Sequence, residues 1–278
     1  LQGVGIVDER GRGVDAVCKR YRELYRHITG IGEKEENGVT IKELQEQFET
    51  ERHIYAKVRE LYYSAVTPNV VLSANWDSPH DLLLEQCHST LFDTFHPSRF
   101  RRLMGRRIQC MDWYVAIYQV VHVLAVLQEE FGLMHNDLHA GNVFINLVDH
   151  TFQWHDFEGA QHNAIPYTMG DNVRHLVPLR GFLVKLGDYN LACTFKPVGE
   201  ERIYSGIARG LYREYGMDGK FHAGYDIQVF LLNLLGFRKK LEIPNEIVRF
   251  ITDLLDFLVP HHKQWYKRVL KRYKDTKF

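Results

Sequence analysis

The chain has few cysteines, and their spacing follows no recognisable pattern. Cys18, Cys87, Cys110 and Cys193 are scattered through 278 residues, and no CxxC pair occurs. This spacing argues against a disulfide framework and against a cysteine-based zinc site. It favours a reducing, intracellular compartment, so the cytoplasm is the expected location.

The sequence also lacks an excess of charge of either sign. Lys and Arg number 35 and Asp and Glu number 35, which gives no net charge at pH 7. We therefore expect no global attraction to nucleic acid or to an anionic membrane. No apolar run reaches the length of a membrane span, and no signal peptide is visible. The charge is uneven only in the basic stretch 261–278. Its pattern predicts a terminal helix that packs on the domain by its apolar face, and the alternative is a surface that binds an acidic partner.

Strand and helix patterns divide the chain into two unequal parts. Residues 1–87 contain the strand-like runs LQGVGIV, VDAVCKRY, NVVLSANW and DLLLEQC, and one amphipathic helix, IKELQEQFETERHIYAKVRELYYSA. In 88–278 helical patterns dominate, including MDWYVAIYQVVHVLAVLQEEFG, DNVRHLVPLRGFLVKL, YDIQVFLLNLL and NEIVRFITDLLDFLV; VFINLV and TFQWH read as two strands joined by a turn. We predict an α+β protein with a small β-rich part, a larger α-rich part and a cleft between them.

The polar residues of MHNDLHAGNVFI cannot be explained by packing. His135, Asp137 and Asn142 have the spacing H-x-D-x-x-x-x-N, and Asp156 follows a predicted strand in HDFEGA. Carboxylates and an amide at strand ends form an all-oxygen set, which suits Mg²⁺. Phosphoryl transfer needs such a set, because its catalysis is largely positioning and neutralisation of phosphate charge.

These two motifs resemble those of the protein-kinase-like superfamily, a catalytic-loop H-R-D-x-x-x-x-N followed by D-F-G. The resemblance implies a bilobal fold, with a β-rich N-lobe that carries one αC-type helix and a larger helical C-lobe. It implies ATP and Mg²⁺ as cofactors. It also implies Asp137 as catalytic base, Asn142 as a metal ligand, Asp156 as the principal Mg²⁺ ligand and His135 as a brace for the loop.

Two residues depart from the protein-kinase pattern. His139 stands where protein kinases usually carry a lysine that contacts the γ-phosphate, and we assign it to the catalytic set. The DLHxGN form is similar to that of aminoglycoside and choline phosphotransferases and of some atypical protein kinases. Glu158 replaces the glycine of D-F-G, and Gly159 follows one position later.

The resemblance also implies nucleotide-binding residues upstream. Lys19 in AVCKRY is similar to the strand lysine that contacts the α- and β-phosphates, and Glu51, with Glu49 as the alternative, to its helix partner. Gly3 and Gly5 resemble the start of a phosphate-covering loop, although Asp8 takes the place of the third glycine.

The stretch LLLEQC resembles the hinge between the lobes. Leu84 would border the pocket, and the backbones of Glu85 and Cys87 would bind adenine. Downstream, Asp171 is expected to open the next long helix and brace the catalytic loop. So few residues separate Asp156 from Asp171 that regulation by activation-loop phosphorylation is not expected.

The leading hypothesis is an ATP- and Mg²⁺-dependent atypical Ser/Thr protein kinase, similar to the divergent kinases of large DNA viruses or to the haspin type. Its partners would be ATP and a protein substrate, in the cytoplasm or, if viral, the host cytoplasm or nucleus. The alternatives are a small-molecule kinase acting on an alcohol and a pseudokinase that acts as a scaffold.

Overall fold

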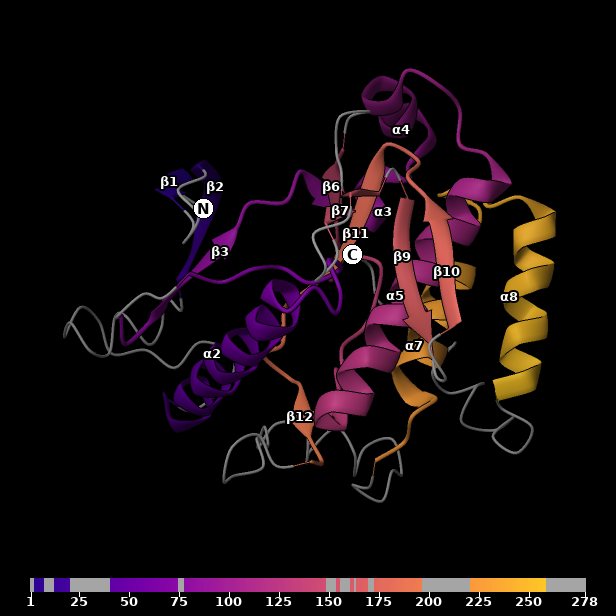
Figure 1. Cartoon of the computed structure of the whole chain (residues 1–278). Coiled ribbons are helices and arrows are strands. Elements are labelled where there is room, and N and C mark those ends of the chain that lie inside the picture. The colour runs from indigo at the N-terminus through magenta and orange to yellow at the C-terminus, as the bar shows by residue number, and fades with distance from the viewer. Residues whose placement is uncertain are drawn as a thin grey trace.

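The computed structural model is a mixed α+β structure in which small sheets alternate with helices (Figure 1). It describes residues 3–7, 13–20, 41–74, 78–148, 154–155, 161–162, 164–169, 173–196 and 221–258. Its helices are α2 (Ile41–Tyr63), α3 (Leu91–Thr94), α4 (Pro97–Met104), α5 (Cys110–Phe131), α7 (Tyr225–Gly236) and α8 (Asn245–Leu258). Its strands are β1 (Gly3–Val7), β2 (Gly13–Arg20), β3 (Asp81–Glu85), β4 (Ser89–Thr90), β5 (Leu133–Met134), β6 (Val143–Leu147), β7 (Trp154–His155), β8 (Gln161–His162), β9 (Ala164–Met169), β10 (Val173–Pro178), β11 (Phe182–Leu186) and β12 (Cys193–Thr194).

Three of the predicted strand runs, LQGVGIV, VDAVCKRY and DLLLEQC, correspond to β1, β2 and β3, which form an antiparallel sheet in the order β1-β2-β3. The strand predicted over NVVLSANW is wrong: its described residues form only isolated bridges, at Val70 and Ser73. The helix predicted over 41–65 is α2, which ends at Tyr63. It lies beside this sheet and faces the rest of the molecule (Figure 1). Its buried residues recur at helical spacing: Phe48, Ile54, Tyr55, Val58 and Leu61. The polar loop predicted over EKEENGVT lies outside the described residues.

Helix α5 is the core helix of the larger part. Its start is fixed by a capping box, in which Gln109 donates its backbone N–H to Asp112, and it ends at Gly132 in the left-handed conformation. By length and composition α5 is long and apolar enough to cross a membrane, but 61% of its most apolar stretch is buried inside the protein. The core helix of a soluble protein has the same length and composition, so these two properties are weak evidence for a membrane span.

One helix prediction in this part is wrong. The segment DNVRHLVPLRGFLVKL contains two strands, β10 and β11, instead of a helix. Pro178 ends β10, and Gly181, with φ 84°, turns the chain into β11. Both residues disfavour a continuous helix. Every residue of β11 is buried, and its sequence FLVKL is apolar except for Lys185.

The strands around the HNDLHAGN loop are also paired differently from the prediction. Strand β6 lies between β4 and β11, whereas Trp154–His155 pairs with β8. The chain leaves β6, forms the antiparallel hairpin β9–β10, and only then returns as β11. Tyr167 of this hairpin donates to Asn69 and packs beside Tyr118 and His122 of α5, so the hairpin is fixed to the core.

Candidate active site

The loop between β5 and β6 is held by buried hydrogen bonds from helix α7. The carboxylate of Asp226, in the first turn of α7, accepts the backbone N–H groups of His135 and Asn136 at 2.8 and 2.9 Å. Asn233 of α7 accepts the N–H of Ala140 at 3.0 Å. Asn136 has φ 65°, a strained conformation for a residue other than glycine. The loop is therefore rigidly positioned on α7.

Asp226 holds this loop through backbone N–H groups alone: among the described hydrogen bonds, none joins its carboxylate to a basic side chain. It is fully buried, and burial raises its pKa above the usual value, although His135 and the two N–H groups act in the opposite direction. Asp171, predicted for this bracing role, lies outside the described residues. The sequence signal for Asp226 was an aspartate opening the apolar helix YDIQVFLLNLL.

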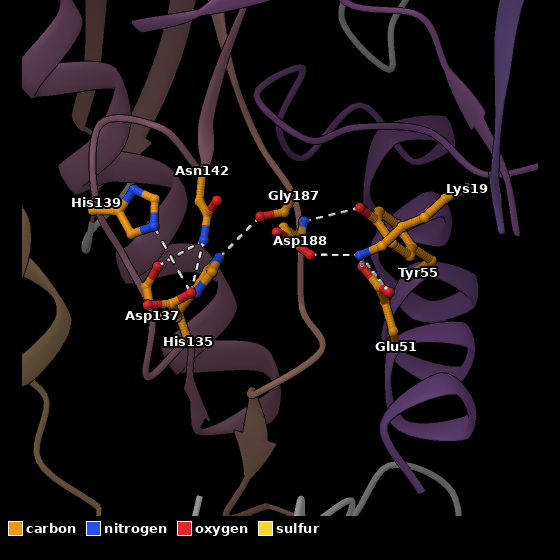
Figure 2. A network of polar contacts seen from close by, with 9 residues as sticks. All are labelled: Lys19, Glu51, Tyr55, His135, Asp137, His139, Asn142, Gly187 and Asp188. Carbon is orange, nitrogen blue, oxygen red and sulfur yellow. Dashed lines mark hydrogen bonds and ion pairs between the residues drawn. The ribbon is translucent and has the colours of Figure 1, made fainter. Parts of the chain in front are cut away.

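Asp137 and Asn142 lie side by side in the loop, and Asn142 is buried (Figure 2). The amide nitrogen of Asn142 donates to the backbone carbonyl of Asp137 at 2.9 Å and to its carboxylate at 3.1 Å. The Asp137 side chain is 40% exposed, so it is accessible from solvent. The motif spacing predicted that these two side chains act together, and the structure places them in contact.

His139 folds back toward Asp137. Its Nδ1 accepts the N–H of Gly141 at 3.0 Å, and its Nε2 lies 3.8 Å from the Asp137 carboxylate. A Cβ on Gly141 would lie 2.8 Å from the ring, so only glycine permits this contact. Burial lowers the pKa of His139, and Asp137 offsets part of this shift. The lowered pKa favours a neutral ring, and because Nδ1 accepts the Gly141 N–H, the proton lies on Nε2.

Lys19 and Glu51, predicted as partners, are brought together by β2 and α2. The ammonium of Lys19 lies 2.8 Å from each carboxylate oxygen of Glu51, which is fully buried. Burial alone would lower the pKa of Lys19, but the charges of Glu51 and Asp188 raise it above the usual value. Lys19 is therefore a fixed cation.

Asp188, like Asp226, is a residue of this site that the sequence did not predict. It follows β11, and its carboxylate lies 2.5 Å from the ammonium of Lys19. Figure 2 shows Gly187 and Asp188 between the Lys19–Glu51 pair on one side and the Asp137–Asn142 pair on the other. Asp156, predicted as the principal metal ligand, lies outside the described residues.

The turn at Gly187 and Asp188 is held from both sides. His135 Nε2 lies 3.0 Å from the Gly187 carbonyl, and the Asp188 N–H donates to the Tyr55 hydroxyl at 2.9 Å. A Cβ on Gly187 would lie 2.9 Å from Val71 and 3.0 Å from the Tyr55 hydroxyl, so the position requires glycine. Asp188 has φ 66°, another strained position at the site.

The predicted hinge residues lie at the end of β3. Leu84 is buried, and the Glu85 carboxylate accepts from Lys185 at 2.8 Å, Asn146 at 2.6 Å and the Leu72 N–H at 3.1 Å. Burial raises the pKa of Cys87 to about 12, so its thiol is protonated at neutral pH. Adenine binding by the Glu85 and Cys87 backbones remains a prediction.

Gly3 and Gly5 lie within β1, opposite Val17 and Asp15 of β2. The turn between these strands, which contains Asp8, is outside the described residues. A phosphate-covering role for the two glycines therefore remains a prediction.

Within the described residues, no group of three or more His, Cys, Asp or Glu side chains is placed to hold a metal ion. The carboxylate of Asp188 and the amide of Asn142 supply oxygen atoms on facing segments, and the carboxylate of Asp137 lies beside Asn142 (Figure 2). Carboxylate and amide oxygens, with positions left for water and phosphate, are the set that Mg²⁺ uses. No family model matches the chain, and none of the curated proteins matches its sequence.

Proposed function

We propose that the chain is an ATP- and Mg²⁺-dependent phosphotransferase with a bilobal, protein-kinase-like fold. The N-lobe would be residues 1–87 and the C-lobe 88–278. The observation that carries the proposal is the placement of Asp188 between Lys19–Glu51 and Asp137–Asn142. A fixed cation, an all-oxygen set and an exposed carboxylate are the components that phosphoryl transfer requires.

Each side chain has a role that its contacts support. Lys19, held by Glu51, would contact the α- and β-phosphates, and Asp188 with Asn142 would hold the metal. When bound, Mg²⁺ would neutralise phosphate charge. Asp137, exposed and oriented by Asn142, would accept the proton of the attacking hydroxyl. The acceptor oxygen then forms its bond to the γ-phosphorus while the bond to the ADP oxygen breaks.

This proposal moves the principal metal ligand from Asp156 to Asp188 and the bracing aspartate from Asp171 to Asp226. The consequence is a long stretch, 189–224, between the metal aspartate and α7. Protein kinases use such a segment to bind a peptide acceptor. The length therefore supports a protein hydroxyl as acceptor and removes the argument against regulation in this segment.

A small-molecule alcohol is the second candidate acceptor, supported by His139. A lysine at this position would add a permanent charge, whereas the ring of His139 is turned onto Asp137 and bonded to Gly141. The same contact is compatible with the DLHxGN loop of small-molecule kinases.

The test is transfer of label from γ-labelled ATP to a panel of Ser/Thr peptides, proteins and small alcohols, with Asp137→Asn as the key variant. We expect Asp137→Asn to bind nucleotide normally and to lose roughly 10²–10⁴-fold in turnover, because only the proton acceptor is removed. Full activity in this variant would refute the site assignment. Label only on small alcohols would refute the protein acceptor, and no response to ATP or Mg²⁺ would favour a scaffold.

A further inference from the structure

A basic surface lies between α4 and the turn that joins α7 to α8. It contains a hollow of about 320 Å³, whose wall includes Arg101 and Arg107 from one side and Leu241 and Pro244 from the other. This volume falls within the usual range for a binding pocket. We use the name basic surface for this hollow and the exposed cations around it: Arg101, Arg102, Arg107, Arg238, Lys239 and Lys240.

The cations of the basic surface outnumber the carboxylates near it. Asp93 lies 3.9 Å from Arg99, and Glu246 accepts a hydrogen bond from the Tyr114 hydroxyl. Glu242 lies in the wall of the hollow and offsets part of the positive charge. Within the described part of the chain, no ion pair to Arg101 or Arg107 is present. The surface therefore carries a local excess of positive charge on a chain with no net charge.

Direct contacts connect this surface to the loop that carries Asp137. The carbonyl of Ala140 accepts the N–H of Phe92 at 3.0 Å, and the Phe92 ring packs on Phe237 with centroids 4.9 Å apart. The ammonium of Lys240 lies 4.5 Å from the centroid of the Phe92 ring. A chain segment bound on the basic surface would thus lie close to the loop that binds the acceptor.

We propose that the basic surface binds an acidic segment of the protein acceptor, so that the chain selects Ser or Thr residues flanked by Asp or Glu. The inference rests on the proposed function, because it names the acceptor class of the same site. Ile108, Leu241 and Pro244 add apolar contact area, which suits side chains of a peptide. Nucleic acid is disfavoured, because the chain has no net charge to attract a polyanion over long range.

The test compares three matched Ser peptides whose flanking residues are acidic, neutral or basic, with the full chain at low and high ionic strength. We expect kcat/KM to be highest for the acidic peptide and its advantage to shrink in high salt. Arg101→Glu/Arg107→Glu should reduce this advantage roughly tenfold, through KM with kcat unchanged. The matched control, Lys42→Glu/Lys57→Glu on α2, makes the same change in charge and should keep the preference.

A binding arm uses the same peptides with Ala in place of Ser, and a single-stranded oligonucleotide of equal charge. Preferential binding of the acidic Ala peptide without transfer to any Ser peptide would refute the protein-kinase proposal and leave the docking surface standing. Transfer without preference for acidic flanks would overturn the docking surface and leave the kinase standing. Tighter binding of the oligonucleotide at Arg101 and Arg107 would also overturn it.

Discussion

Two lysines of this molecule, Lys185 and Lys19, are each paired with a glutamate, yet one is buried and the other is half-buried. Lys185 on β11 lies 2.8 Å from Glu85, and its side chain is 4% exposed. Lys19 on β2 lies 2.8 Å from Glu51 and 2.5 Å from Asp188, and its side chain is 29% exposed. The first pair is enclosed, whereas the second can be reached by a ligand.

The charges of the two clusters differ in the same way. Lys185 and Glu85 neutralise each other, and Glu85 is further satisfied by Asn146 and by the Leu72 N–H. Lys19, Glu51 and Asp188 together carry one more negative than positive charge. A neutral, satisfied pair is complete without a ligand. An excess carboxylate beside a fixed cation is the arrangement expected where a metal and a phosphate are to bind.

The largest effect is expected from Lys185→Met. It would leave Glu85 in the protein interior without its cation, which costs about 3–5 kcal/mol in the free energy of unfolding. Urea denaturation measures this loss. Lys185→Met/Glu85→Gln should recover part of it, because the remaining amide has no charge to bury. If the single variant is as stable as the wild type, Lys185 is not the enclosed cation described here.

The pH dependence of this loss sharpens the same test. Burial lowers the pKa of Lys185, but Glu85 and Tyr62 raise it above the usual value overall. A raised pKa in the folded state means that the stabilisation is complete below the pKa of the unfolded chain, near 10.4, and is lost as pH rises through the folded value. The difference between wild type and Lys185→Met should therefore be constant from pH 7 to 9 and shrink only at higher pH.

The second prediction concerns Lys19→Met. We expect a loss of roughly 10²–10³-fold in kcat/KM, because a preorganised cation aimed at phosphate is removed. The variant also leaves Glu51 buried and unpaired, so its stability must be controlled. Lys19→Met/Glu51→Gln should regain stability but not activity. Recovery of both would show that Lys19, like Lys185, serves the fold alone.

The sequence predicted the residues whose motifs are short and contiguous. Asp137 and Asn142 lie within one loop, and Lys19 and Glu51 lie on elements whose periodicity is clear. Asp188 was not predicted, because the hairpin β9–β10 separates β6 from its partner β11 and the two apolar strands β10 and β11 in succession resemble a helix. Asp156 of HDFE matches the expected motif and stays a prediction, because it lies outside the described residues. Pro178 and Gly181 were the local signals that a helix could not continue there.

The third prediction decides between Asp188 and Asp156. Asp188→Asn should weaken Mg²⁺-dependent ATP binding roughly tenfold or more, about 1.4 kcal/mol, because one carboxylate of the metal set is lost. Asp156→Asn is the matched comparison and should bind like the wild type. Titration calorimetry with and without Mg²⁺ provides the measurement. The opposite result would return the metal site to Asp156 and leave Asp188 as a partner of Lys19 only.

The smallest loss of stability is expected at an ion pair that is exposed to solvent and lies outside the proposed site. Lys57 on α2 lies 3.1 Å from Glu60, with side chains 38% and 63% exposed. Solvent screens such pairs, so Lys57→Ala should cost no more than about 0.5 kcal/mol in the free energy of unfolding, and salt should reduce the cost further. Activity should be unchanged, because Lys57 is paired with Glu60 rather than with the site. A loss as large as that of Lys185→Met would mean that enclosure does not distinguish the lysines, and the contrast between structural and ligand-binding cations would fail.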